Sequence, residues 1–309
     1  MVLHWLRYKL MAKVHRGRKI GVRACGLLAL LCSLLSVAAD PTTLIVTVPV
    51  ANMYSAPTGE SDVVSQALYG SNVVVTEEKA AWAKVETSDH YSGWIALDQA
   101  RRLSPSDSRY ANSGEVLHVS TLSANLYREP DVTAHRPVLT IPYETQLEFL
   151  AEGKGEDAGW LQVRLPDNQS AWIQAGDVAS SSQPLSIDGS IKLARQFLGV
   201  TYTWGGRSSF GFDCSGFTQM LVRSRGINMP RDADQQAAWD GVFAIDRKHL
   251  RAGDLLFFGS SADHITHTGM FIGDGQFIHD TTYGRPGVQI SRLNDQPWTH
   301  LLVACRRVK

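Results

Sequence analysis

The alternation of apolar and polar residues along this chain changes character twice. Residues 26–39 form one apolar run, GLLALLCSLLSVAA, behind a basic segment. From about 44 to 180, short runs alternate apolar and polar residues between turn residues, which predicts β-strands. From residue 187 helical spacing appears, in Ile191–Leu198 and in 215–226, before alternation returns. The pattern therefore predicts an all-β middle and a C-terminal region that mixes helices and strands.

The first 39 residues have the order of parts of an export signal. They contain seven Lys or Arg and no acid, and the apolar run ends in small residues before Asp40. That run is shorter than the roughly 20 residues that a membrane-spanning helix needs. Cys32 follows Leu31, where a lipid-anchor signal has a small residue. We therefore expect residues 1–39 to be a cleaved signal peptide, and the chain to be periplasmic or secreted without a stable membrane anchor.

The charge balance excludes one broad class of function. The 309 residues carry 30 Lys and Arg and 30 Asp and Glu, so the formal net charge is zero. Once the first 39 residues are set aside, the rest has a net charge of −7. A strongly basic balance is typical of nucleic-acid binders, so we expect no nucleic-acid partner.

The middle of the chain contains a repeat. The pattern A-N-x-Y-x-x-P, then W-x-x-V, then W-I begins at Ala51 and again at Ala124. It resembles bacterial SH3-like domains, which implies two small all-β barrels, at 44–104 and 115–180. Trp82 and Trp160 are expected to fill the barrel interiors, and the Ser-rich stretches around 104–113 and 180–186 are expected to be linkers.

Cys214 is the candidate nucleophile. The sequence Gly211-Phe212-Asp213-Cys214-Ser215-Gly216-Phe217 places it between a loop and the predicted helix 215–226. Backbone N–H groups at a helix start stabilise an anion, which lowers the pKa of a thiol there. The thiolate then needs a base within hydrogen-bond reach.

Two histidines in a predicted hairpin are the candidate bases. Residues 266–272 alternate like a strand, Gly273-Asp274-Gly275 is a turn, and the return strand ends at His279. A three-residue loop places His279 opposite Gly269, on the same face as His267, whereas a two-residue turn places the two histidines on opposite faces. The first register lets His267 take the thiol proton while His279 orients its ring.

Simpler roles compete with each assignment. Cys214 could form a disulfide with Cys305, the other cysteine left after the signal. His264, His267 and Cys214 could hold zinc, although zinc needs about four ligands. Asp213 and Asp232 could serve only as helix N-caps.

Six motifs in order give residues 188–309 a clear resemblance to the NlpC family of cell-wall cysteine peptidases. They are Tyr202-x-Trp204-Gly205-Gly206, Asp213-Cys214-Ser215-Gly216-Phe217, Met229-Pro230-Arg231-Asp232, Gly253–Phe258, His267-x-Gly269–Gly273 and Phe277-Ile278-His279. The resemblance implies an α+β fold with a papain-like C-terminal catalytic domain behind the two SH3-like barrels. It also implies Cys214 as nucleophile, His267 as base and His279 as third member, with no metal and no cofactor.

With SH3-like domains in front, the chain resembles the subgroup that cuts muropeptides between γ-D-glutamyl and a diamino acid. That subgroup implies a clamp for the free amine of an N-terminal L-Ala. The resemblance assigns substrate binding to six residues: Asp213, Ser215, Asp232, Tyr202, Tyr91 and Asp62. Ala233 departs from the pattern, since some members have Ser there.

The resulting hypothesis is an exported cysteine endopeptidase whose partners are peptidoglycan stem peptides or muropeptides. Two alternatives remain open: a wall-binding scaffold with an idle catalytic domain, and a papain-like amidase or acyltransferase. Diaminopimelate and lysine both fit as the diamino acid, and both intact sacculus and released fragments fit as substrate.

Overall fold

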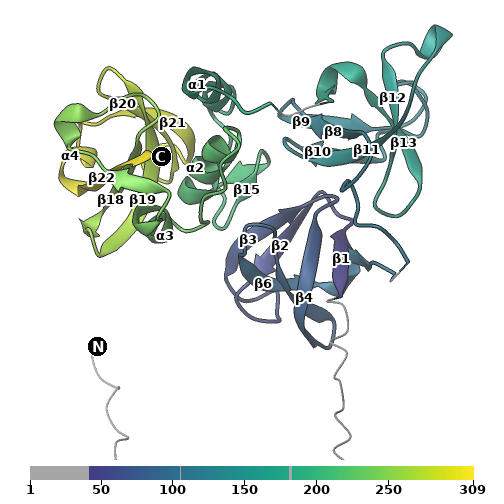
Figure 1. Ribbon diagram of the computed structural model, residues 1–309, viewed down its shortest axis with the longest axis horizontal. Coiled ribbons are helices and arrows are strands. Elements are labelled where there is room, and N and C mark those ends of the chain that lie inside the picture. Colours follow the sequence, from purple (N-terminus) through teal and green to yellow (C-terminus); the bar gives the residue numbers. More distant parts are fainter. Residues whose placement is uncertain (1–41, 105, 181–182) are drawn as a thin grey trace, which may run out of the picture. The chain divides into compact units, whose positions relative to one another are not determined.

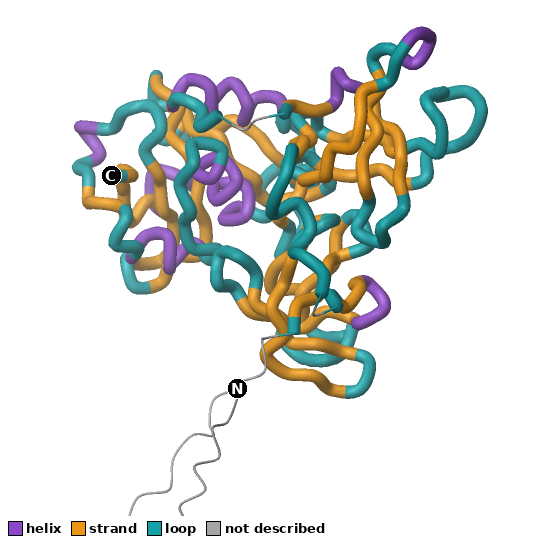
Figure 2. Tube along the Cα trace, turned by 45° about the vertical axis from the view of Figure 1, so that its right-hand side comes forward, coloured by secondary structure: helices purple, strands orange, loops and turns teal. Residues whose placement is uncertain are grey.

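The computed structural model of the protein describes residues 42–309 except 105 and 181–182. The expected signal peptide, residues 1–39, lies outside the described residues. Strands are the main element in Figure 2, and the longer helices lie beside the C-terminal sheet.

The first barrel is one antiparallel sheet with strand order β3-β2-β6-β5-β4-β1-β7 (Figure 1). Its strands are β1 (Thr43–Val46), β2 (Val50–Tyr54), β3 (Val63–Leu68), β4 (Asn72–Lys79), β5 (Trp82–Glu86), β6 (Ser92–Ala96) and β7 (Ala100–Arg102). Apolar side chains such as Met53, Val85 and Ile95 alternate inward and are fully buried. Each fully buried side chain of this size contributes about 1.5–3 kcal/mol to folding.

The second barrel repeats this plan with a five-stranded sheet, β13-β12-β11-β8-β14, and a pair, β10-β9. Its strands are β8 (Val116–Val119), β9 (Ser123–Leu126), β10 (Leu139–Pro142), β11 (Gln146–Glu152), β12 (Trp160–Arg164), β13 (Ser170–Gln174) and β14 (Val178–Ala179). Leu126, Val163 and Ile173 hold the same inward positions as Met53, Val85 and Ile95 in the first copy. The sequence repeat is therefore also a structural repeat.

The prediction that Trp82 and Trp160 fill the barrel interiors is wrong. Both side chains are only half-buried, because the period of two along a strand turns their neighbours inward instead. Trp82 packs edge-on against Tyr54 at 5.5 Å between ring centroids, and Trp160 packs against Tyr127 at 5.4 Å. The repeated tryptophan thus belongs to an aromatic pair on the outer face of each barrel.

The C-terminal domain is a six-stranded antiparallel sheet with helices on both faces (Figure 1). The strand order β17-β22-β18-β19-β20-β21 joins β17 (Val242–Ala244), β18 (Leu255–Ser261), β19 (His264–Gly273), β20 (Gln276–Thr281), β21 (Gly287–Arg292) and β22 (Leu302–Val308). The helices are α1 (Ile187–Gln196), α2 (Cys214–Arg223), α3 (Ala233–Ala238) and α4 (Trp298–Leu301), and a short hairpin pairs β15 (Arg207–Ser208) with β16 (Gly211–Phe212).

Two apolar cores hold the sheet between its helices. On one face α2 buries Phe217, Met220 and Leu221 against β19 and β20. On the other face Trp298 of α4 packs with Phe258 and Phe277. Because α2 is buried over almost its whole length, its first residue is fixed against the sheet.

The helix predicted over 215–226 ends earlier, at Arg223. The backbone of Gly226 has a φ of +78°, a conformation that a helix cannot contain and that glycine adopts without strain. At the other end Asp213 is the N-cap and accepts a hydrogen bond from the N–H of Gly216 at 2.7 Å. The start of α2, which carries Cys214, is therefore the firmly fixed end.

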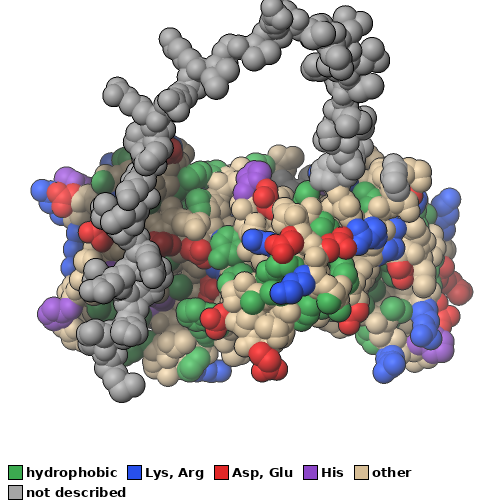
Figure 3. Space-filling model, turned by 90° about the horizontal axis from the view of Figure 1, so that it is seen from below, with side chains coloured by type: hydrophobic (Ala, Val, Ile, Leu, Met, Phe, Trp, Pro, Cys, Tyr) green, Lys and Arg blue, Asp and Glu red, His purple; other side chains and the backbone are tan. Residues whose placement is uncertain are grey.

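Acidic and basic side chains are interspersed on the face of the molecule in Figure 3. Electrostatic recognition on that face must therefore come from particular side chains. None of the helices in the described part of the chain is long and apolar enough to cross a membrane. The domain limits 44–104, 115–180 and 188–309 remain predictions.

Candidate active site

Cys214 is the first residue of α2, and its side chain is buried. Burial, followed by the charge of Asp213, raises the pKa of the Cys214 thiol to about 12. The backbone N–H groups of Thr268 and Ser215 act in the opposite direction without outweighing the burial. The expectation of a lowered pKa is therefore wrong for the substrate-free protein, in which Cys214 is a thiol at neutral pH.

The hairpin that carries the two histidines reaches its register by an unexpected route. The loop has two residues, Asp274 and Gly275, both with positive φ, rather than the expected three. A bulge at Ile272 adds one residue to β19, so Met270 pairs with Ile278 and Gly269 lies beside His279. The bulge restores the shared face for His267 and His279 that a two-residue loop alone removes.

The two histidines form a hydrogen-bonded chain that ends on Ser291. His267 Nε2 lies 2.7 Å from His279 Nδ1, and His279 Nε2 lies 3.0 Å from Ser291 Oγ of β21. All contacts are satisfied when His267 donates from Nε2 to His279, and His279 donates from Nε2 to Ser291. This arrangement leaves Nδ1 of His267 as the nitrogen available to take a proton.

Aromatic rings surround the two hydrogen-bonded histidines and keep both imidazoles uncharged. Trp298 stacks on His267 at 5.3 Å between centroids and meets His279 edge-on at 4.7 Å. Burial lowers the pKa of His267 to about 3, and burial and the neighbouring His267 lower the pKa of His279 well below its usual value. Both imidazoles are neutral at pH 7, so His267 is able to accept a proton.

Asp213 and Ser215 flank Cys214 and are held by Arg231. The Arg231 guanidinium donates to both carboxylate oxygens of Asp213, at 3.0 and 2.6 Å, and to Ser215 Oγ at 2.8 Å. It also reaches the carbonyl of Gly206 and, in the first barrel, Ser65 Oγ. Because Arg231 is 2% exposed, this is a buried, fork-like ion pair at the head of α2.

Asp232 is held from the first barrel by Tyr91. The Tyr91 hydroxyl donates to the two Asp232 carboxylate oxygens at 3.3 and 3.1 Å. Burial raises the pKa of Asp232, and the Tyr91 hydrogen bond and Arg231 act against that rise. Asp232 does not cap α3 with its side chain, so the simpler role of a helix cap does not account for it.

Tyr202 and Asp62, the other two residues predicted to bind substrate, lie in different surroundings. Tyr202 is half-buried, and its pKa is raised first by burial and then by the nearby Cys214 and Asp213, which places it beside the head of α2. Asp62 is exposed in the loop before β3, and within residues 42–309 as described its carboxylate makes no hydrogen bond or ion pair. The structure therefore brings Tyr202 to the site and leaves Asp62 without a contact there.

Asp280, next to His279 on β20, is a buried acid that sequence reasoning missed. Both carboxylate oxygens lack a hydrogen-bond partner among the described residues, and the side chain is fully buried. Burial, then the charge of Asp213, raises the pKa of Asp280 to about 8. Asp280 is therefore a neutral acid at pH 7, close enough to Asp213 and Tyr202 to affect their electrostatics.

Asp280→Asn is expected to stabilise the protein increasingly as the pH rises from about 4 to about 8. The folded protein keeps the Asp280 proton up to about pH 8, whereas the unfolded chain loses it near pH 4. The stability that Asp280 contributes is thus complete below about pH 4 and lost by about pH 8, a difference of at most about 5 kcal/mol. Urea unfolding of both proteins across this range measures it. A difference between variant and wild type that stays constant from about pH 5 to 9 contradicts the prediction.

The structure does not form the disulfide that competes with the role of Cys214 as nucleophile. Cys214 and Cys305 are both free, and Cys305 lies on β22 in the core beneath the other face of the sheet. Sequence reasoning also gave no role to Ser291, Trp298 or Arg231. Arg231 stood inside a recognised motif, which was the one available signal, whereas nothing local marks Ser291 or Trp298.

Comparison with known proteins decides the family. A gamma-D-glutamyl-L-lysine dipeptidyl-peptidase of Bacillus cereus is 34% identical over 258 residues, which cover 79% of this chain and 74% of the relative. This chain belongs to the NlpC/P60 family. The NlpC/P60 family model matches residues 199–307, and the model of the bacterial dipeptidyl-peptidase Sh3 domain matches residues 53–99.

A further relative and a solved structure resemble the chain over most of its length. A gamma-D-glutamyl-L-lysine dipeptidyl-peptidase of Bacillus subtilis is 31% identical over 79% of this chain and 80% of its own. The crystal structure of an NlpC/P60 family protein from Bacillus cereus superposes with a TM-score of 0.74 at 29% identity, covering 86% of this chain and 99% of that one. The family and the α+β, papain-like class with SH3-like barrels predicted from the sequence are thus confirmed, and the chain is a peptidase.

Proposed function

We propose that this NlpC/P60 peptidase is an exported enzyme that hydrolyses the γ-D-glutamyl–diamino acid bond of peptidoglycan stem peptides with a free N-terminal L-Ala. The names of the two Bacillus relatives give a γ-D-glutamyl-L-lysine bond for those proteins. The observation that supports the proposal is the contact between the Tyr91 phenol of the first barrel and the Asp232 carboxylate of the C-terminal domain, which lies near enough to Arg231 and Asp213 for their charges to affect its pKa.

In this proposal Cys214 is the nucleophile and His267 the general base. The thiol gives its proton to Nδ1 of His267, and the sulfur attacks the γ-carbonyl carbon of the D-glutamyl residue. The thiol pKa of about 12 and the imidazole pKa of about 3 mean that the pair is neutral before substrate arrives. Proton transfer is therefore coupled to the attack.

His279 and Ser291 are positioning residues in this scheme. A proton arriving at Nδ1 of His267 makes its ring a cation, which the hydrogen bond from Nε2 to His279 Nδ1 stabilises. Ser291 holds the His279 ring from its far side. In the proposal, the same contacts fix the orientation of the His267 ring that accepts the thiol proton.

The proposed reaction has two steps, formation of a thioester and its hydrolysis. Attack forms a tetrahedral oxyanion, which backbone N–H groups at the start of α2 stabilise. Collapse breaks the C–N bond, and the His267 proton passes to the leaving amine of the diamino acid. Water then attacks the resulting thioester with His267 as base, which releases L-Ala-γ-D-Glu and restores the Cys214 thiol.

The proposal gives the substrate ammonium to Asp232 rather than to both acids. Arg231 already neutralises Asp213 through two charged hydrogen bonds. Among the described residues, the Asp232 carboxylate accepts only from the Tyr91 phenol and, at 3.4 Å, from Gln235 Nε2, so its oxygens keep free acceptor capacity. Asp213 and Ser215 then shape the pocket through Arg231, and Tyr202 lines it beside Cys214.

N-acetylation of the substrate tripeptide L-Ala-γ-D-Glu-diamino acid is expected to lower kcat/KM by about 10- to 100-fold. The acetyl group removes the charge that Asp232 binds, and a hydrogen bond to a charged group contributes about 1.5–3 kcal/mol. Rates on the free and acetylated tripeptides, measured by liquid chromatography and mass spectrometry, test this. Product masses also separate this endopeptidase from an amidase or acyltransferase.

The control is a pair of neighbouring acids. Asp232→Asn is expected to bring the two rates close together, whereas Asp234→Asn, at an exposed position two residues later, leaves the preference intact. Equal rates on both tripeptides with the wild-type enzyme contradict the amine clamp. Absence of the dipeptide product contradicts the assigned bond.

A further inference from the structure

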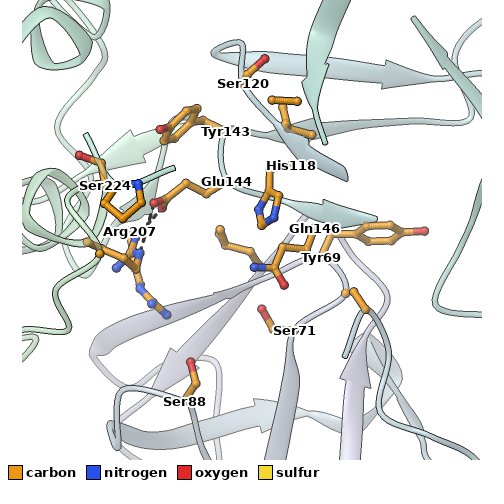
Figure 4. Close-up of a pocket in the computed structure, with 18 of the residues that line it drawn as sticks. Tyr69, Ser71, Ser88, His118, Ser120, Tyr143, Glu144, Gln146, Arg207 and Ser224 are labelled. Atoms are coloured by element: carbon orange, nitrogen blue, oxygen red, sulfur yellow. Dashed lines mark hydrogen bonds and ion pairs between the residues drawn. The ribbon is translucent and has the colours of Figure 1, made fainter. Parts of the chain in front are cut away.

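A cavity lies where the two barrels and the C-terminal domain meet, and none of the predicted catalytic residues lines it. It has a volume of about 860 Å³ (Figure 4). Its walls come from residues 68–73 and Thr87-Ser88 of the first barrel, His118–Ser120 and Tyr143-Glu144 of the second, and α1 with the end of α2. None of Cys214, His267, His279, Asp213 and Asp232 lines it. Its size is that of a small-molecule site.

The charges that line this junction cavity are mostly positive. Arg207 and Arg223 lie in its wall, and the exposed Arg109 and Lys192 are at its edge, whereas Glu144 is its one acidic lining residue among those described. Arg223 forms an ion pair with Glu144, in which its Nη2 and Nε donate to the two carboxylate oxygens at 2.6 and 3.3 Å. The acid is therefore unavailable to the other cations.

Arg207 is a buried lining cation that the described residues leave incompletely satisfied. Its guanidinium approaches one carboxylate, Asp89, at 3.7 Å, which is an ion pair without a hydrogen bond. Its Nε is buried and has no acceptor within the described part of the chain. Burial, then the nearby Arg223, lowers the pKa of Arg207 to about 10, so it remains a cation at neutral pH. A buried guanidinium in this state lacks an acceptor that a ligand is able to supply.

The rest of the wall supplies neutral polar groups. Figure 4 shows His118 and Gln146 of the second barrel beside Tyr69 and Ser71 of the first, around the same space as Arg207. Burial lowers the pKa of His118, so its ring is neutral at pH 7 and able to donate or accept a hydrogen bond. The lining thus combines guanidinium forks with hydroxyl, amide and imidazole groups.

We propose that this junction cavity binds a small oxyanion-bearing molecule, a carboxylate or a phosphate, through the guanidinium of Arg207. The planar fork of Arg207 matches both anions, and an oxyanion in the cavity is able to accept hydrogen bonds from its Nη groups, to which the described residues offer only the 3.7 Å ion pair with Asp89. A ligand of this class that fills the cavity contacts all three domains and so stabilises their arrangement. It also contacts the loop that holds Asp89 and Tyr91, since Thr87 and Ser88 line the cavity.

The test uses the whole chain from Asp40 and follows the ring signal of His118 by NMR together with calorimetric titration. The two probes are inorganic phosphate and the dicarboxylate dipeptide L-Ala-γ-D-Glu, each at constant ionic strength. We expect a shift of the His118 signal and a Kd on the order of 1 mM or tighter for at least one probe. Response to phosphate alone identifies a phosphate site, and response to the dipeptide identifies a carboxylate site.

Variants locate the binding and keep the test independent of folding. Arg207→Gln is expected to weaken binding by at least about tenfold, and His118→Gln, which removes no charged group, serves if the first variant does not fold. Lys154→Gln is the matched control, because Lys154 is exposed and does not line the cavity. No shift of His118 with either probe, or equal binding by wild type and both cavity variants, overturns the proposal. The readout is binding and not turnover, so its failure leaves the proposed peptidase function untouched.

Discussion

Cys214→Ala is expected to lower kcat/KM on the free tripeptide by at least about 10⁴-fold while leaving the protein folded. The proposed thioester cannot form without the sulfur, and the neutral His267 has no comparably strong nucleophile to deprotonate. Alanine occupies nearly the same space at the buried start of α2, where the Asp213 cap and the Arg231 ion pair do not involve the thiol. Release of L-Ala-γ-D-Glu, followed by mass spectrometry, measures the loss.

Cys305→Ala is the matched control for this experiment. Among the described residues Cys305 is the other buried, free cysteine, and it lies on β22, whereas Cys214 begins α2. Its replacement is expected to leave turnover within about twofold of the wild type. Wild-type turnover by Cys214→Ala overturns the nucleophile assignment, and equal losses in both variants indicate a shared structural defect instead.

Arg231→Met is expected to destabilise the protein by about 3–5 kcal/mol and to abolish most activity. Methionine fills similar volume but removes both hydrogen bonds to Asp213, which leaves that carboxylate buried without its partner. It also removes the hydrogen bonds to Ser65, Ser215 and Gly206. An unpaired buried charge is far more costly than a missing pair. Urea unfolding followed by tryptophan fluorescence measures the change.

A double-mutant cycle separates charge from packing at this site. Asp213→Asn combined with Arg231→Met removes both charges, so it is expected to recover part of the stability that Arg231→Met loses. Arg225→Met is the control, since Arg225 has no ion pair in the described structure and lies just beyond α2. A loss in Arg225→Met as large as in Arg231→Met contradicts the role given to the buried pair.

The positions of the strands in the barrels could be predicted from the sequence, whereas the outward packing of the repeated tryptophans could not. The repeated motifs fall on β2 and β9, on β5 and β12, and on β6 and β13. Alternation alone does not say which of the two faces is inside, and a large aromatic residue suggested the wrong one. In each barrel small and branched residues such as Val85 and Val163 fit the tight interior, and the tryptophan packs outside.

The candidate site was predictable where its residues sit in motifs and unpredictable where it depends on tertiary packing. Local sequence placed Cys214 at the start of a helix, but the pKa of its thiol depends on how deeply α2 is buried by the sheet. The alignment of His267 with His279 depends on a bulge at Ile272, which has no sequence signal of its own. Ser291 comes from a different strand of the sheet, so only the fold brings it to His279.

The contact between Tyr91 and Asp232 joins positions 141 residues apart in the chain. The proposed nucleophile and the Tyr91 phenol that holds the ammonium-binding Asp232 are therefore encoded in separate stretches of the gene. Exchange of the first barrel between relatives, by recombination or by engineering, would change the group that holds Asp232 and leave the nucleophile unchanged. In a protein built this way, substrate preference is able to change without any change in the catalytic residues.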